Sequence, residues 1–358
     1  MFYAPQGGGV RRYIEAKRGW LRDTAGCGHT LLVPKARSAA AEQHTIALPS
    51  VRLPFSSGYR VPLGTSPASQ KLIALRPSVI EVGDPYSLAW GALAAGKALG
   101  VPVVAFCHSD MPRLVGERLG PRAERIAALY CARLYRRFDL VLAPSRMMMG
   151  RLRTWGVAKA IHQPLGVDID VFHPRRRNAD LRRMLRLPEE TRLLVYAGRF
   201  APEKNLQVFA DAMRRLDSAH VALFIGAGRV PANLPGNVRV LPYVDGREAL
   251  ATLLASCDAF VHPGDQETFG LAALEAMACG IPVIGVRAGA VAELVPHDAG
   301  VLVPPRDALA LAKAITGLFK RDHRAMGAEA RRAAERYAWP AVLEGILGHY
   351  TALEKRPR

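Results

Sequence analysis

Cysteine is scarce in this chain and never occurs as a closely spaced pair. The 358 residues include five cysteines, Cys27, Cys107, Cys131, Cys257 and Cys279. An odd number without a Cys-x-x-Cys spacing argues against a zinc site and against a disulfide framework, and it favours a reducing cytoplasm. Cys107, Cys257 and Cys279 stand in apolar runs, so we expect their thiols to be small buried side chains.

Long apolar runs are also missing. No stretch of about 18 uncharged apolar residues occurs, so the sequence predicts no membrane-spanning helix. The segment from Met1 to Gly9 lacks the charged and then apolar pattern of a signal peptide. With 50% hydrophobic and 22% charged residues, the composition is that of a globular protein, and the length predicts two domains.

Acidic residues are few in the first half of the chain. Residues 1–165 contain 23 Lys and Arg against 9 Asp and Glu, a net charge of +14, whereas residues 166–358 contain 26 against 22. This asymmetry indicates an anionic partner such as acidic lipid, a phosphorylated acceptor or nucleic acid. Nucleic acid is disfavoured because no aromatic residues are interleaved with the basic ones. A helix expected over 123–137 brings together Arg122, Arg125, Arg133, Arg136 and Arg137, either to meet a membrane or only to solubilise the surface.

Apolar runs typical of strands alternate with helical patterns along the whole chain, which indicates an α/β protein with parallel sheets. The expected strands are 29–33, 79–82, 101–106, 140–143, 193–197, 221–225, 238–241, 259–261, 283–286 and 301–303. The expected helices are 88–99, 123–137, 206–216, 249–255, 271–278, 308–318, 325–336 and 340–352. Pro164 and Gly166 interrupt the pattern, so we place a hinge there, with domains over 1–165 and 166–338 and a terminal segment over 339–358.

The most informative segment is ETFGLAALEAMACGIPVI, from Glu267 to Ile284. A polar loop opens here into a helix that ends at Gly280, so the backbone N–H groups of Phe269, Gly270 and Leu271 are predicted to form an anion site. Glu275 lies two turns inside this otherwise apolar helix, where an isolated carboxylate is costly. It either binds a ligand hydroxyl pair, such as a ribose diol, or forms a salt bridge in the core.

A second candidate site is the loop GRFAPEKN, which follows the strand 193–197. Arg199 and Lys204 would flank the carboxyl end of a parallel strand, where ligands bind in open α/β sheets. Two cations at that place can neutralise a departing diphosphate. The alternative is a solvated loop with an Arg–Glu pair.

Two weaker candidates lie in the first half. Gly7, Gly8 and Gly9 could let backbone N–H groups approach a phosphate, or they could form an ordinary flexible loop. His108 follows the strand 101–106 and could hydrogen-bond a substrate, although a single histidine is more often structural.

Two patterns resemble ligand motifs but lack the expected context. Asp168-Ile-Asp170 resembles an Asp-x-Asp metal motif, yet it stands in the hinge without a preceding strand. Gly226-Ala-Gly228 follows a strand, but an isolated Gly-x-Gly is a weak nucleotide signal.

Taken together, these segments resemble the retaining glycosyltransferases of family 4, which have the GT-B fold of two Rossmann-like domains facing a cleft. The resemblance covers nearly the whole chain and rests on the Glu-x7-Glu motif at Glu267 and Glu275, the GRF and EK elements, GGGVRRY and PLGVD. It implies that Glu275 binds the nucleotide ribose and that Glu267 contacts the donor hexose. It also implies that Arg199 and Lys204 hold the diphosphate.

The same resemblance assigns the remaining roles. Phe269, Gly270 and Leu271 would lie near the donor, Gly8 and Gly9 would close on the diphosphate, and His108 would lie beside the transferred sugar. A less specific match to the family places Tyr243 and Val244 at the pocket for the nucleotide base. The last helix, 340–352, is expected to return to the first domain.

The resemblance implies transfer of a hexose from a GDP- or UDP-linked donor to a lipid-linked or glycan acceptor. Mannose is the hexose expected, because the chain most resembles bacterial mannosyltransferase-type proteins. No metal and no cofactor are expected, and the location is cytoplasmic, with peripheral attachment to the inner face of the membrane as an option. The alternatives are another GT-B enzyme, an epimerase or phosphorylase, and an inactive nucleotide-binding or membrane-adaptor protein.

A final expectation concerns the start of the chain. In the resembling family a short apolar strand precedes the glycine loop, but here only six residues precede Gly7, and Pro5 cannot donate to a strand ladder. We therefore expect the first strand to be missing, the true start to lie upstream and this form to be poorly stable, because the neighbouring strands would keep unpaired backbone groups.

Overall fold

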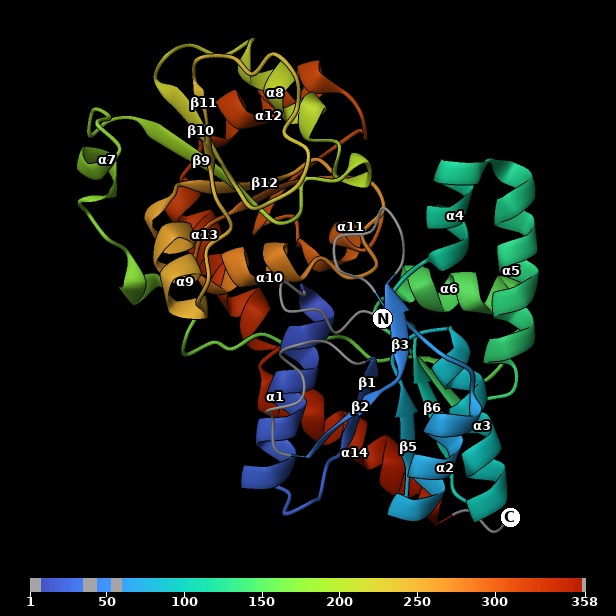
Figure 1. Cartoon of the computed structure of the whole chain (residues 1–358). Coiled ribbons are helices and arrows are strands. Elements are labelled where there is room, and N and C mark those ends of the chain that lie inside the picture. The colour runs from blue at the N-terminus through green and yellow to red at the C-terminus, as the bar shows by residue number, and fades with distance from the viewer. Residues whose placement is uncertain (1–7, 35–43, 53–59, 356–358) are drawn as a thin grey trace. The chain divides into compact units, whose positions relative to one another are not determined.

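The computed structural model describes residues 8–34, 44–52 and 60–355 and divides the chain into two compact units (Figure 1). Unit 1 comprises Met1–Pro164 and Pro340–Arg358, and unit 2 comprises Leu165–Trp339. These boundaries differ by one residue from those expected from the sequence. Within the described residues, no helix is long and apolar enough to cross a bilayer.

The described strands of unit 1 form three separate sheets. One is a parallel sheet in the order β5-β6-β7-β8, one is the parallel pair β1-β2, and one is the antiparallel pair β3-β4. The strands are β1 (Leu31–Pro34), β2 (Thr45–Leu48), β3 (Ser50–Arg52), β4 (Arg60–Pro62), β5 (Ile80–Val82), β6 (Val103–Phe106), β7 (Leu140–Ala143) and β8 (Ala160–His162). β6 and β7 lie inside their sheet and are almost wholly buried, as central parallel strands must be.

Helices surround the sheets of unit 1. They are α1 (Gly9–Asp23), α2 (Ser66–Leu75), α3 (Ser87–Leu99), α4 (Met111–Leu119), α5 (Pro121–Tyr135), α6 (Arg146–Thr154) and α14 (Trp339–Glu354). Side-chain caps fix two of the starts, because Asp110 accepts from the N–H of Arg113 and Ser145 from that of Met148. Gly100, with φ of 68°, ends α3 in the left-handed conformation.

Unit 2 is built on one parallel sheet of six strands in the order β11-β10-β9-β12-β13-β14. The strands are β9 (Arg192–Ala197), β10 (His220–Ile225), β11 (Val238–Leu241), β12 (Ala259–His262), β13 (Val283–Val286) and β14 (Gly300–Val303). The helical segments are η2 (Pro174–Arg176), α7 (Leu181–Met184), η3 (Pro202–Lys204), α8 (Leu206–Met213), α9 (Arg247–Ser256), α10 (Leu271–Ala278), α11 (Val291–Leu294), α12 (Ala308–Leu318) and α13 (His323–Glu335). The strand order reverses beside β9, since β10 and β12 lie on its two sides, and such a switch point favours a ligand site at the carboxyl ends.

The α/β fold class is confirmed, and each of the two units is built on parallel sheets, as the resemblance to the GT-B fold implies. All ten expected strands and eight expected helices occur, most with ends shifted by one to three residues. Twelve described elements were not predicted: β2, β3, β4, β8, α1, α2, α4, α6, α7, α11, η2 and η3. The four buried cysteines include Cys107, Cys257 and Cys279, as expected, and only Cys27 is exposed.

The expectation of a missing first strand concerns residues 1–7, which lie outside the described residues. The last helix, α14, belongs to unit 1 over almost its whole length. Its Tyr350 accepts a hydrogen bond of 2.7 Å from the Lys17 ammonium of α1.

Candidate functional site

The carboxyl ends of β9 and β12 in unit 2 bring together a lysine, a glutamate and a histidine. Lys204, at the end of η3, forms an ion pair with Glu267 in the loop after β12. His262, the last residue of β12, bonds through Nε2 to the same carboxylate oxygen at 2.9 Å. The side chains of Lys204, Glu267 and His262 are 16%, 19% and 3% exposed, so the three groups interact away from bulk water.

The electrostatics keep Glu267 ionised. Burial alone would raise the pKa of this carboxyl, but the Lys204 ammonium and the hydrogen bond from His262 outweigh burial and lower it well below its usual range. A permanently charged Glu267 can accept hydrogen bonds but cannot donate a proton. Its chemistry is therefore to hold cations and hydroxyl groups in place.

Backbone contacts hold the loop that carries Glu267. The N–H of Ala290 donates to the Glu267 carbonyl at 2.8 Å, and a Cβ at Gly289 would lie 3.1 Å from the backbone of Glu267. Gly289 also has φ of 63°, which strains any other residue. Asp265 extends the network, since it accepts from Asn205 at 3.1 Å and from Arg306 at 2.9 Å.

The second predicted cation, Arg199, differs from Lys204 in its surroundings. Its side chain is 60% exposed and lies 3.5 Å from the Glu203 carboxylate. The Tyr196 hydroxyl donates to the Arg199 carbonyl at 2.9 Å and so fixes the backbone of the loop. The structure thus contains the Arg–Glu pair of the alternative interpretation, while Lys204 already has Glu267 as counter-ion.

Helix α10 begins beside this cluster. Its N-cap residue, Gly270, has φ of 95°, and a Cβ there would meet Val291 at 2.9 Å, so the turn requires glycine. Phe269 is buried against Tyr337, with ring centroids 6.1 Å apart. The first N–H groups of α10, including that of Leu271, have no intrahelical acceptor and can receive an anion.

Glu275 is buried inside α10 with 2% of its surface exposed. Burial raises the pKa of the Cys279 thiol, one turn further along, and the negative charge of Glu275 raises it further. The predicted burial of this carboxylate is therefore observed. Its role with a ribose stays a prediction.

The other predicted residues belong to other segments of the chain than the Lys204–Glu267–His262 cluster. Tyr243 and Val244 follow β11 in unit 2, and Tyr243 is 45% exposed. Gly8 is the N-cap of α1, Gly9 is its first residue, and Gly7 lies outside the described residues. These glycines and His108 belong to unit 1.

His108 follows β6 and is 9% exposed, stacked on Phe106 with ring centroids 4.3 Å apart. Burial, aided by Lys17 and opposed by Glu81, lowers the pKa of His108 to about 4. The imidazole is therefore neutral at physiological pH, which suits a hydrogen-bonding role.

The two ligand-like patterns have structural roles. Asp168 accepts from the backbone N–H groups of Asp170 and Val171 and from Arg247 at 3.1 Å, so it holds a turn. Gly228 packs on Phe200, where a Cβ would lie 2.3 Å from the carbonyl oxygen. Within residues 8–34, 44–52 and 60–355, no cluster of His, Cys, Asp and Glu could hold a metal ion.

Sequence reasoning missed His262, Asn205 and Asp265 as members of this site. His262 ends an apolar strand directly before a proline, a signal as strong as that of His108. Asn205 and Asp265 flank predicted residues, but nothing in their spacing indicates that they bind each other across 60 positions.

Family models match both halves of the chain. The one described as Glycosyl transferases group 1 covers residues 178–338, and the one described as Glycosyltransferase Family 4 covers residues 7–171. A GDP-mannose-dependent alpha-(1-6)-phosphatidylinositol dimannoside mannosyltransferase of Mycobacterium tuberculosis is 32% identical, over 98% of this chain and 94% of its own. The chain belongs to glycosyltransferase family 4. A GDP-mannose-dependent alpha-mannosyltransferase of Mycolicibacterium smegmatis is 35% identical, over 82% and 79% of the two chains.

Solved structures agree on the fold of this family 4 member. Anabaena HepE, in complex with UDP and glucose, superimposes with a TM-score of 0.76 at 21% identity, covering 97% of this chain and 96% of HepE. A sucrose-phosphate synthase of Thermosynechococcus elongatus gives 0.75 at 22% identity, covering 97% and 94%. As a family 4 enzyme, this chain is a hexosyltransferase that uses a nucleotide-sugar donor.

Proposed function

We propose that this enzyme transfers mannose from GDP-mannose to a lipid-linked or glycan acceptor, with retention of configuration and without a metal ion or cofactor. The donor is inferred from relatives in Mycobacterium, Mycolicibacterium and Corynebacterium whose names specify GDP-mannose-dependent mannosyl transfer. The observation that carries the proposal is the cluster of Lys204, Glu267 and His262 at the carboxyl ends of β9 and β12, beside the start of α10.

The cluster can bind both parts of a sugar diphosphate. An ammonium has three donors, so Lys204 can bond Glu267 and still reach a phosphate oxygen. Arg199 and the N-terminal N–H groups of α10 add positive potential to the same region of unit 2. Glu267 offers carboxylate oxygens to the hexose hydroxyls, and Glu275 is proposed to receive the ribose diol.

Catalysis then depends on charge that develops on the leaving group. The acceptor oxygen forms a bond to the anomeric carbon on the same face from which the diphosphate departs. The bond between that carbon and the phosphate oxygen breaks, and the proton of the acceptor hydroxyl passes to the diphosphate. Lys204 and Arg199 stabilise the departing charge, which is larger in the transition state than in the bound donor. Neutral His108 is proposed to bond a hydroxyl of the transferred sugar.

A donor screen tests this proposal. The purified chain is incubated with GDP-mannose, GDP-glucose, UDP-glucose and UDP-galactose, and both the melting temperature and the slow release of nucleoside diphosphate are measured. We expect GDP-mannose to give the largest thermal shift and the fastest release. Preference for a UDP-sugar would reject the assignment of the base, and preference for GDP-glucose would reject that of the sugar.

We further propose that unit 1 meets an anionic membrane through one face of α4 and α5. Three apolar side chains of these two helices are largely exposed, Leu119 by 74%, Ile126 by 70% and Leu129 by 71%. The exposed residues Arg122, Arg125, Ile126, Leu129 and Arg133 repeat at helical spacing along α5. Apolar residues that can enter the interface, ringed by arginines worth about 1 kcal/mol each near anionic lipid, are typical of peripheral binding.

Sedimentation with liposomes tests the membrane surface. We expect the chain to sediment with vesicles that contain anionic lipid and to remain free with neutral vesicles at low salt. The variant Ile126→Ser/Leu129→Ser should weaken sedimentation without changing donor hydrolysis, since neither residue belongs to unit 2. Equal sedimentation with neutral and anionic vesicles would remove the membrane proposal.

A further inference from the structure

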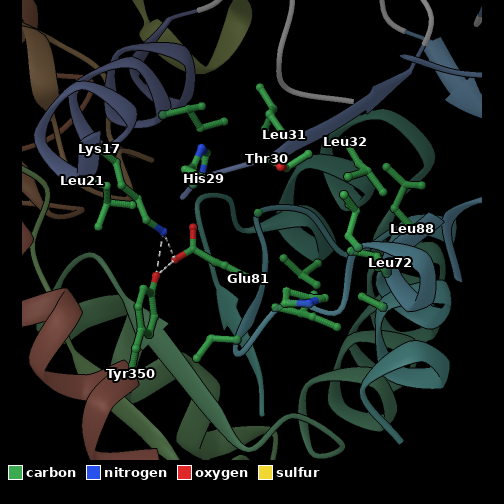
Figure 2. Close-up of a pocket in the computed structure, with 18 of the residues that line it drawn as sticks. Lys17, Leu21, His29, Thr30, Leu31, Leu32, Leu72, Glu81, Leu88 and Tyr350 are labelled. Carbon is green, nitrogen blue, oxygen red and sulfur yellow. Dashed lines mark hydrogen bonds and ion pairs between the residues drawn. The ribbon is translucent and has the colours of Figure 1, made fainter. Parts of the chain in front are cut away.

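Unit 1 contains a cavity of about 690 Å³ between strands β1 and β5. Both strands lie at the edge of their own sheet, β1 next to β2 and β5 next to β6. Figure 2 shows Lys17 and Tyr350, from α1 and α14, on one side of this cavity and Leu72 and Leu88, from α2 and α3, on the other. The cavity is therefore a slot with two strand edges as opposing walls and helices over its two faces.

The backbone of both edges points into the slot. In a parallel pair, the N–H and C=O of one residue point to one neighbour and those of the next residue point to the other side. The N–H of Leu31 donates to His44 beside β2 at 2.9 Å, so the peptide groups of Leu32 face away from β2. The N–H of Ile80 donates to Pro102 beside β6 at 3.0 Å, so those of Glu81 face away from β6. Among the described residues no strand pairs with either edge.

Lys17 and Glu81 neutralise each other in the slot. The Lys17 ammonium donates to Glu81 at 2.9 Å and to the Tyr350 hydroxyl at 2.7 Å, and the Tyr13 hydroxyl donates to Glu81 at 3.0 Å. Lys17 is only 4% exposed, so this ion pair is a fixed part of the wall. Apolar side chains of Ile14, Leu31, Leu72 and Ile80 also line the slot, beside polar ones such as His29, Thr30 and Asp84.

We propose that the slot binds one extended apolar peptide strand, hydrogen-bonded in parallel to β1 and β5, which joins their two sheets into one. A strand of four to six residues spans about 13–20 Å at 3.3 Å per residue, which covers β1 and β5 along their length. Parallel pairing is favoured because both neighbours already run in parallel sheets. An apolar strand fits because helices cover both faces of the slot, so its side chains would be buried on both sides.

This inference does not depend on the donor or on the transfer reaction. The peptide groups of Leu32 and Glu81 carry it, together with the apolar walls. It belongs to the recognition mode in which a segment adds a strand to an exposed sheet edge, with two edges used here instead of one.

The experiment uses the intact chain and a synthetic peptide of five alternating Val and Leu residues with one Lys at each end. Binding is measured by fluorescence and by the melting temperature, which a ligand of the folded state raises. Hydrogen exchange is then followed at single amides. We expect the amides of Leu32 and Glu81 to exchange at least about tenfold more slowly with peptide bound, while those of Leu31 and Ile80 change much less because they are already bonded.

A matched peptide separates strand pairing from simple filling of an apolar pocket. Methylation of its five central backbone nitrogens keeps every side chain but removes the donors. We expect this peptide to bind at least about tenfold more weakly, because each lost hydrogen bond weakens association. Equal binding of the two peptides, or no binding of either, would overturn the proposal.

Cys27 provides a test of direction. It is the exposed cysteine of the five, it lines the slot, and it lies four positions before β1, at the amino end of that strand. With a fluorophore on Cys27, a quencher on the amino end of a parallel peptide should reduce the signal more than one on its carboxyl end. The opposite order would show an antiparallel strand and overturn the parallel assignment.

Discussion

The substitution Lys204→Met tests whether the ion pair with Glu267 holds the donor site together. Methionine keeps the apolar stem and removes the ammonium. Glu267 then keeps only His262 as a partner, at 2.9 Å, among the hydrogen bonds described for its side chain. Loss of one partner from a buried pair costs about 3–5 kcal/mol, because the other charge stays buried without compensation.

We place the cost for Lys204→Met lower, at about 2–3 kcal/mol, because both side chains retain some exposure and His262 remains. For a unit of this size, each kcal/mol lowers the melting temperature by roughly 2–4 °C, so unit 2 should melt about 4–12 °C earlier at pH 7. The control Lys313→Met replaces an exposed lysine on α12 and should change stability by less than about 0.5 kcal/mol.

The pH dependence of this effect has a definite sign. The pKa of Glu267 is lowered in the folded protein, so its pairing stabilises the fold above the unfolded pKa of about 4.3, and that stabilisation is lost as the pH falls through the folded value. In Lys204→Met the ammonium no longer offsets the burial of Glu267, so burial raises the pKa of this carboxyl. Protonation of Glu267 then removes the cost of a buried unpaired charge as the pH falls to about 5 and below. Calorimetry should show that the difference in melting temperature between wild type and Lys204→Met becomes smaller from pH 7 to pH 4.5. Equal melting of wild type and Lys204→Met at pH 7 would refute the ion pair.

Two further changes separate binding from turnover and test the buried histidine. Glu275→Ala should raise the dissociation constant for free GDP about tenfold or more while kcat falls less, because a ribose contact exists in ground and transition states alike. Normal GDP binding by this variant in titration calorimetry would reject the ribose role. His108 has a folded pKa of about 4, below the unfolded value of about 6.5. Its neutral form therefore stabilises the fold above pH 6.5. That contribution, roughly 3 kcal/mol in all, is lost as the pH falls towards 4. His108→Gln should therefore flatten the fall in melting temperature between pH 6.5 and 4.5, and an unchanged slope would contradict the assignment.

Sequence reasoning located strands whose residues are mostly apolar. β7 and β13 lie inside their sheets and have the predicted bounds, because a strand buried on both faces is a continuous apolar run. The edge strand β11 also has the predicted bounds, although it is only partly buried. β2 and β8 are edge strands with partly exposed residues, and both were missed. Helix α1 was missed because its sequence begins with glycines and contains many charged residues, although its buried side includes Tyr13, Lys17 and Leu21 at regular helical spacing.

The candidate site shows the same limit. Motif spacing located Lys204 and Glu267, which lie 63 positions apart, but it did not predict that they form an ion pair with each other. That contact depends on β9 and β12 being neighbours in the sheet, which the order of strands along the chain does not reveal. His262 was overlooked for the same reason, since its importance comes from the carboxylate that the fold places beside it.

Metal-independent transfer with retention is tested by measuring two quantities with GDP-mannose in the presence of EDTA, the release of nucleoside diphosphate and the anomeric configuration of the product. We expect wild type to release GDP in EDTA, added manganese to change the rate little, the mannosyl product to keep the alpha configuration and Lys204→Met to lower the rate by about two orders of magnitude or more. Activity that disappears in EDTA and returns with manganese, or an inverted product, would contradict this proposal.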